Sequence, residues 1–121
     1  MLSWALCIST INRLEILKCC IRQALVQSRP PHEIIVVDAS ADWQANAAAI
    51  AALVTAAPAI SLRYGPAPAR SLPAQRNAAI AQSTADILFM IDDDALMYPD
   101  CAAAIMAVYD ADRGPDIAAV G

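Results

Sequence analysis

The chain of 121 residues is long enough for one domain built around one hydrophobic core. With 59% hydrophobic and 17% charged residues, its composition excludes an intrinsically disordered chain. The formal net charge of −4 disfavours nucleic-acid binding, which calls for a basic face, so an anionic ligand would need a metal or a few placed arginines.

The cysteines and the apolar runs indicate what kinds of site and which cellular location the protein can have. No two cysteines have metal-site spacing, and the adjacent pair Cys19 and Cys20 lies in a helical pattern, so neither a zinc site nor a disulfide framework is expected. Reduced thiols in a cytoplasmic protein are therefore predicted. Residues 1–9 lack a basic residue, which favours a strand over a signal peptide. No apolar run approaches the roughly 20 residues of a membrane span, but membrane association of a longer parent protein stays open.

Strand and helix patterns alternate along the chain. Short apolar, β-branched runs predict the strands, and apolar residues at helical spacing predict the helices. Capping patterns at Asn12 with Glu15, and at Asp42, predict two helix starts, and Gly114 with Pro115 predicts a break near the end. In chain order we expect a strand at 4–9, a helix from 14 to before 30, a strand at 34–37, a helix after 42 that ends before 58, a strand at 60–64, a helix from 73 to about 83, a strand at 87–91, a helix from 99 to about 109, and a strand at 117–120.

This order predicts a single α/β domain over residues 1–121, with three α/β/α layers and a mainly parallel sheet. In such sheets, ligands bind beyond the carboxyl ends of the strands. Polar residues follow three of the predicted strands and are expected to gather at that edge: Ser9, Thr10 and Asn12, then Asp38, then Asp92, Asp93 and Asp94.

Three adjacent carboxylates after an apolar strand require compensation, because like charges at this range oppose each other's ionisation. Oxygen-only ligands suit Mg²⁺ or Mn²⁺, which also bind substrate phosphates. In an extended segment Asp92 and Asp94 share a side while Asp93 faces elsewhere. One carboxylate could hold the metal while another accepts bonds from a ribose. A solvated loop, or a cap for the helix near Pro99, is the alternative.

The other candidates each have a structural alternative. Asp38 either hydrogen-bonds a base or ribose or starts a turn. Asn12 is better explained as a helix cap than as a ligand contact, and Ser9 and Thr10 fit either role. Arg76, near the start of its helix, could clamp a phosphate or lie on the surface.

Absent motifs exclude other nucleotide-binding classes. The chain has only three glycines, so it contains neither a Gly-x-Gly-x-x-Gly turn nor a phosphate-cradling Gly-rich loop. A dinucleotide oxidoreductase and a P-loop NTPase are therefore disfavoured. If a ligand with a phosphate binds, a metal ion and an arginine would have to contact the phosphate in place of a glycine-rich loop.

Four segments together resemble the N-terminal, nucleotide-sugar-binding part of a family 2 glycosyltransferase, which has a Rossmann-like GT-A fold. They occur in family order and span most of the chain. The segments are 9–13, 33–38 with Ser40, 73–79, and 89–94 followed by Pro99 and Asp100.

The resemblance implies that Asp38 contacts the nucleoside and Arg76 the diphosphate of a nucleoside-diphosphate sugar. It also implies that the aspartates form the metal-binding Asp-x-Asp motif, with Asp94 as the direct ligand of Mg²⁺ or Mn²⁺ and Asp92 as the second candidate. The base identity stays open, because Ile11 stands where many relatives carry a tyrosine that stacks on uracil. The residues implied in nucleotide-sugar binding are Ser9, Thr10, Asn12, Asp38, Arg76, Asp92 and Asp93.

The implied reaction is metal-dependent transfer of the sugar to an acceptor hydroxyl, with inversion. Family members continue for roughly another hundred residues, which shape the acceptor site and supply an Asp or Glu base. We therefore expect a truncated chain that is inactive alone, with its base beyond Gly121 and its acceptor unknown.

Three alternatives remain. A non-catalytic nucleotide-binding or regulatory module would keep the fold without turnover. A nucleotidyltransferase uses a related sheet, but the missing glycine-rich loop after the first strand counts against it. A fragment with uncovered apolar surface would self-associate.

Overall fold

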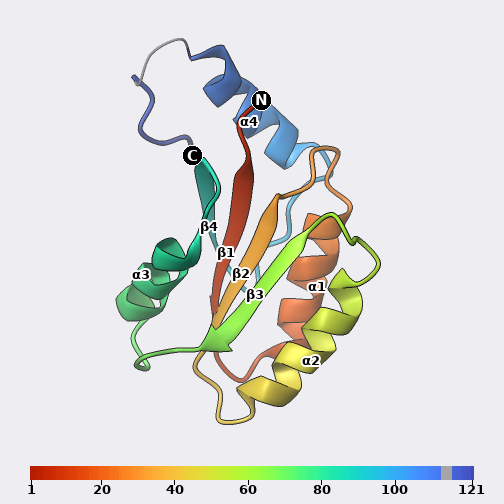
Figure 1. The fold of residues 1–121 in the computed structure, drawn as a ribbon, viewed down its shortest axis with the longest axis vertical. Helices are drawn as coiled ribbons and strands as arrows, with labels where there is room; N and C mark the ends of the chain where they lie inside the picture. Colours follow the sequence, from red (N-terminus) through yellow and green to blue (C-terminus); the bar gives the residue numbers. More distant parts are fainter. Residues whose placement is uncertain (113–115) are drawn as a thin grey trace.

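The computed structural model describes residues 1–112 and 116–121, and within these ranges a four-stranded sheet is covered by helices on both faces (Figure 1). All of its strand pairs are parallel, and the strand order is β3-β2-β1-β4. In chain order the elements are β1 (Trp4–Thr10), α1 (Leu14–Leu25), β2 (Glu33–Asp38), α2 (Trp43–Val54), β3 (Ser61–Pro66), α3 (Leu72–Gln82), β4 (Ile87–Asp92) and α4 (Cys101–Ala111). The predicted α/β class and parallel sheet are confirmed.

The two central strands are buried on both faces, because side chains that alternate along a strand point to opposite sides of the sheet. Leu6 and Ile8 of β1 pack in one core with residues of α1, α2 and α4. Ala5 and Cys7 belong to a second, smaller core that includes Ala79 of α3. Among the described elements, α3 packs on one face of the sheet, and α1, α2 and α4 pack on the other. These two cores give the three predicted layers (Figure 1).

The turn between β1 and α1 differs from the prediction, because Asn12 is not the N-cap of the helix. Arg13 holds the N-cap position, without a side-chain capping bond. Asn12 has a φ of 52°, in the left-handed region that asparagine tolerates better than most residues. Its backbone N–H donates to Ser40 Oγ at 2.7 Å, so Asn12 shapes the turn and ties it to the segment after β2.

One predicted strand is absent, and the others differ from their predicted bounds by one or two residues. Residues 117–120 form no strand, so the predicted fifth strand is wrong. A short apolar run lacks a defining period, and a strand needs a ladder partner that the run itself does not specify. β3 continues to Pro66, two residues beyond the predicted end, because a proline without an N–H is accepted on an edge strand.

The last helix also starts later than predicted, at Cys101 rather than Pro99. The break predicted at Gly114 and Pro115 lies outside the described residues. Across residues 1–112 and 116–121, no helix has the length and hydropathy needed to span a membrane.

Candidate functional site

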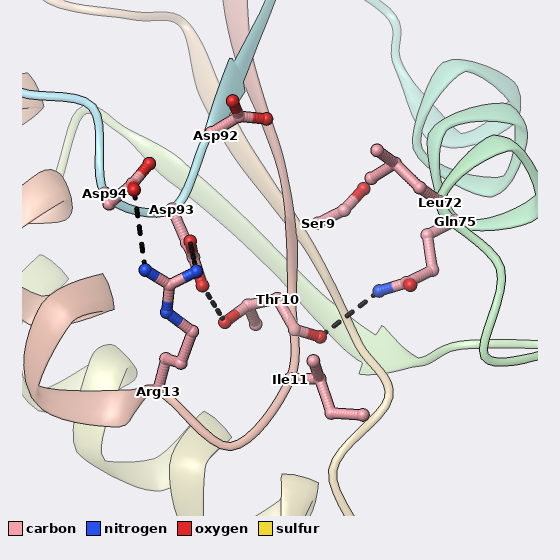
Figure 2. A pocket seen from close by; sticks show the side chains of 9 residues that line it. All are labelled: Ser9, Thr10, Ile11, Arg13, Leu72, Gln75, Asp92, Asp93 and Asp94. Atoms are coloured by element: carbon pink, nitrogen blue, oxygen red, sulfur yellow. Dashed lines mark hydrogen bonds and ion pairs between the residues drawn. The ribbon is translucent and has the colours of Figure 1, made fainter.

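The carboxyl ends of three neighbouring strands meet at one edge of the sheet. In the strand register Ser9 of β1 lies opposite Asp92 of β4, and Thr10 lies opposite Asp38 of β2. A cavity of about 300 Å³ opens at this edge. It is lined by the end of β1 and the turn that follows, by the beginning of α3, and by the three aspartates 92–94 (Figure 2).

The middle aspartate of the run is a buried anchor. Asp93 is 5% exposed, and Thr10 Oγ1 donates to its Oδ2 at 2.8 Å. Its Oδ1 lies 3.2 Å from Arg13 Nη1. Asp93 therefore points back toward β1 and α1 (Figure 2). It does so from a turn rather than from the extended segment that was predicted, since β4 ends at Asp92 and the N–H of Ala95 donates to Asp92 O at 3.1 Å. It fixes the position of the loop after β4.

The outer two aspartates are exposed, and among the described residues their side chains are held by arginines. The side chains of Asp92 and Asp94 are 68% and 59% exposed. Asp92 Oδ1 lies 3.5 Å from Arg76 Nη2, and Asp94 Oδ2 lies 3.4 Å from Arg13 Nη2. Ion pairs of this exposure are weak, worth about 0–1 kcal/mol each. Both carboxylates are therefore available to another cation.

The donor set fits a divalent cation that shares its ligands with a phosphate. Within the described ranges, no group of three or more His, Cys, Asp or Glu residues is arranged to hold a metal. Mg²⁺, however, is typically held by one or two carboxylates together with waters and substrate phosphates, and Asp92 and Asp94 supply two oxygen donors at the cavity. The residues thus suit a metal that binds with a diphosphate better than a metal bound by protein alone.

Arg76 of α3 is exposed and lies beside Asp92, but it is not part of the cavity lining. The helix begins favourably, since Ser71 occupies the N-cap and its Oγ accepts from Ala74 N at 3.4 Å, and Pro73 lies in the first turn. The sequence prediction that α3 carries an arginine to this edge agrees with the structure. Its role toward a phosphate stays a prediction.

Asp38 is placed differently from a ligand contact. It is 1% exposed and is not part of the cavity lining. Its carboxylate accepts from Ser40 N at 2.8 Å, from Asn46 Nδ2 at 3.0 Å and from the Tyr64 hydroxyl. Burial alone would raise the pKa of Asp38, but these hydrogen bonds outweigh burial and lower it. In this state Asp38 joins β2, α2 and β3.

Gln75 is a site residue that the sequence analysis did not identify. It is buried on α3, and its Nε2 donates to Thr10 O at 3.2 Å and to Val37 O at 3.1 Å (Figure 2). It therefore bridges the ends of β1 and β2 beneath the cavity. The signal was present in the helical spacing, since Gln75 and Ala79 are four residues apart and share the face that packs on the sheet.

The structure brings most of the predicted residues together. Ser9, Thr10 and the three aspartates line the cavity, with Arg76 beside Asp92. Asn12 and Asp38 do not line it. Arg13, which the resemblance included only as part of a segment, contacts two of the aspartates. The sequence signal for this role was the position of Arg13, a cationic residue directly after the turn that follows β1.

Comparison with known proteins identifies the family. The family model described as glycosyl transferase family 2 matches residues 5–120, nearly the whole chain. A search of curated proteins found no match.

Solved structures share the fold at low sequence identity. One is the mannosyltransferase PcManGT from Pyrobaculum calidifontis, in complex with GDP-Man and Mn²⁺, with a TM-score of 0.76 and 21% identity over 93% of this chain and 33% of that chain. Another is S. aureus TarS 1-349 in complex with UDP, with a TM-score of 0.70 and 17% identity over 89% of this chain and 32% of that chain. TarS 1-349 was also solved in complex with UDP-GlcNAc (TM-score 0.69, 18% identity, 89% of this chain and 31% of that chain). The chain thus spans about a third of the length of these proteins.

Proposed function

This chain belongs to glycosyl transferase family 2 and has the Rossmann-like GT-A fold, and from this premise we propose that it is the donor-binding part of a metal-dependent enzyme. The enzyme transfers a sugar from a nucleoside-diphosphate sugar to an acceptor hydroxyl, with inversion. The observation that carries the proposal is the pair of exposed carboxylates, Asp92 and Asp94, at a cavity beyond the strand ends, where each contacts an exposed arginine. The solved proteins of the same fold that hold GDP-Man with Mn²⁺, UDP, or UDP-GlcNAc support it.

The acidic run and Arg76 divide the work at the diphosphate. Asp94, with Asp92 beside it, would hold Mg²⁺ or Mn²⁺, which supplies Lewis-acid stabilisation of the charge on the departing diphosphate. Arg76 binds a phosphate oxygen through its planar guanidinium, a geometry suited to bidentate contacts. Asp93 keeps the run in position through its bond from Thr10.

We assign the nucleoside end of the site to the end of β1 and the turn that follows it. Ser9 and Thr10 line the cavity there, and Asn12 sets the turn's shape. Contact between Asp38 and the nucleoside requires Tyr64 or Asn46 to turn aside, since both donate to the same carboxylate oxygen. Ile11 offers an apolar surface to a base but no aromatic stacking.

The acceptor hydroxyl needs a general base, which we assign to a part of the protein that follows residue 121. The chain spans about a third of the solved proteins with this fold, so residues 1–121 alone are expected to bind the donor without transferring its sugar.

The proposal is tested by calorimetric titration of UDP and of GDP into residues 1–121, with and without Mn²⁺. We expect binding of at least one nucleotide that depends on Mn²⁺. Asp94→Asn should weaken that binding about tenfold or more, as expected for the loss of a charged contact. Asp100→Asn is the matched control, because Asp100 is exposed, nearby in sequence and outside the cavity lining, and it should leave binding unchanged.

Two results would contradict the proposal. If neither nucleotide binds with or without Mn²⁺, the chain is not a donor-binding unit. If Asp94→Asn retains full metal-dependent affinity, the carboxylate of Asp94 does not hold the metal.

A further inference from the structure

The guanidinium of Arg13 occupies the place where a cation would neutralise the acidic run. Its Nη1 lies 3.2 Å from Asp93 Oδ1, and its Nη2 lies 3.4 Å from Asp94 Oδ2. Figure 2 shows the guanidinium reaching up from the start of α1 to lie between these two carboxylates. Arg13 thus bridges the anchor of the run and one of the carboxylates assigned to the metal.

The two contacts of Arg13 differ in how readily they can be exchanged. The side chain of Asp93 is 6% exposed, and Thr10 also donates to it, so this contact belongs to the folded framework. The side chain of Asp94 is 59% exposed, and the contact is longer. Water or a competing cation can therefore replace Arg13 at Asp94 while the contact to Asp93 persists.

Building on the proposed function, we propose that Arg13 is a positioning residue that competes with the divalent metal for Asp94 and gives it up when a nucleoside diphosphate arrives. In the nucleotide-free site the guanidinium acts as a stand-in cation. In the loaded site its Nη2 turns to a phosphate oxygen, while Nη1 remains on Asp93. Arg13 thereby makes metal binding depend on nucleotide binding.

The charges at the cavity give the physical reason. The guanidiniums of Arg13 and Arg76 lie within 3.5 Å of three carboxylates, so these five side chains carry one net negative charge. A divalent cation added at Asp94 would face the positive charge of Arg13 across a single carboxylate, and like charges at such range oppose binding. A diphosphate brings the negative charge that offsets both cations. Metal and nucleotide should therefore strengthen each other's binding by the same factor.

The test measures free Mn²⁺ by its electron paramagnetic resonance signal in titrations of residues 1–121, with no nucleotide, with UDP and with GDP. Arg13→Gln removes the charge but keeps an amide donor for the buried Asp93. We expect this variant to bind Mn²⁺ alone about threefold to tenfold more tightly than the wild type, the order expected when one exposed ion pair and its repulsion are removed. The strengthening of Mn²⁺ binding by nucleotide should shrink by a similar factor.

Two further variants make the result specific. Arg22→Gln removes an equal charge from the exposed last turn of the same helix and should leave Mn²⁺ binding unchanged. Arg13→Lys keeps the charge but lacks the fork that bridges two carboxylates, so its Mn²⁺ affinity should lie between those of wild type and Arg13→Gln. It also serves if the glutamine variant fails to fold.

The outcomes separate this inference from the proposed function. If the wild type binds Mn²⁺ with nucleotide, but Arg13→Gln and Arg13→Lys bind Mn²⁺ alone no more tightly than the wild type, Arg13 does not compete for Asp94 and only this inference fails. If Arg22→Gln shows the same gain as Arg13→Gln, the effect is one of net charge, and the inference again fails. If the wild type binds no Mn²⁺ even with nucleotide, the proposed function fails as well.

Discussion

Gln75 provides a direct test of how the site is held together. Its amide nitrogen donates to Thr10 O and Val37 O, the only described side-chain bonds from α3 to the ends of β1 and β2. Gln75→Met keeps the length of the side chain and its packing but removes both donors. The helix that carries Leu72 and Arg76 would then lose its buried polar link to the ends of β1 and β2 and keep only exposed polar contacts with the sheet, such as that of Arg76 with Asp92.

The expected cost follows from the two lost bonds. Each buried hydrogen bond contributes about 1 kcal/mol net, so Gln75→Met should lower the free energy of unfolding by about 2 kcal/mol. Thr10 O keeps the N–H of Ala39 at 3.0 Å, which holds the cost below that of an unpaired carbonyl. In a domain of this size, such a loss corresponds to a fall in Tm of roughly 8 °C.

Thermal unfolding followed by circular dichroism measures the effect, with Gln82→Met as the matched control. Gln82 lies on the same helix, but its Nε2 donates only within the helix, to Ala78 O at 3.1 Å, and the side chain is partly exposed. The control should shift Tm by less than about 2 °C, since such surface substitutions are usually near neutral. A Gln75→Met variant that melts with the control would refute the assigned role of the two bonds.

Two further predictions concern titration and thiol chemistry. Burial raises the pKa of Glu33 and of Asp38, but hydrogen bonds outweigh it and lower both below their ordinary values. Their contribution to stability is therefore complete above the unfolded pKa of about 4 and is lost as the pH falls through the folded pKa values. Tm should stay level from pH 8 to 6 and drop below about pH 4. An equal drop in a Glu33→Gln, Asp38→Asn variant would contradict this prediction. Burial, and then the charges of the nearby aspartates, raise the pKa of the Cys20 thiol to about 12. Iodoacetamide at pH 8 should therefore modify the exposed Cys19 and spare Cys20, which peptide mass mapping can show. Modification of Cys20 before Cys19 would refute this prediction.

The sequence predicted the fold well where the hydrophobic pattern was distinct, either as a short apolar run or as a helical period. β1 and β2 read as short apolar runs because both of their faces are buried, and α1 shows its buried face at Leu17, Ile21 and Ala24. The prediction is wrong at 117–120, where the apolar run forms no strand. Strand pairing depends on a neighbour's backbone, and four apolar residues carry no information about it.

The site was predicted through topology rather than through single motifs. Parallel strands end at one edge, so the residues after β1 and β4 had to meet there, as the pairing of Ser9 with Asp92 shows. The partners of long side chains could not be predicted in the same way. Arg13 and Gln75 reach their partners across elements distant in sequence, and the direction of a long side chain depends on rotamers that packing selects.

Local backbone choices were also beyond the sequence argument. Asparagine favours both the N-cap position and the left-handed conformation, so Asn12 followed by Glu15 satisfied a capping pattern without forming one. What decided between the two was the hydroxyl of Ser40, which accepts from the Asn12 N–H. That partner lies 28 residues away in sequence, on the segment that follows β2, and the pairing of β1 with β2 places it beside the turn.

The acidic residues fall into two groups: those held by buried hydrogen bonds stabilise the fold, and those held by exposed, replaceable contacts can bind a ligand. β2 carries a buried carboxylate at each end. Glu33 accepts from Ser83 Oγ at 2.8 Å and from Thr84 N at 2.7 Å, and Asp38 is likewise held by short bonds inside the protein. Removing such partners leaves a buried charge uncompensated, so a ligand cannot displace them without a large cost.

Asp92 and Asp94 differ in every one of these respects. Both are exposed, and each is held by one arginine at 3.4 Å or more, a contact that water can replace at little cost. At each of these two residues a metal or a diphosphate would have to displace one exposed arginine contact, whereas at Asp38 it would have to displace several buried hydrogen bonds. On this argument we expect the diphosphate end of the donor to bind after the exchange of a weak arginine contact, whereas the nucleoside end would first have to release Asp38 from Tyr64 or Asn46.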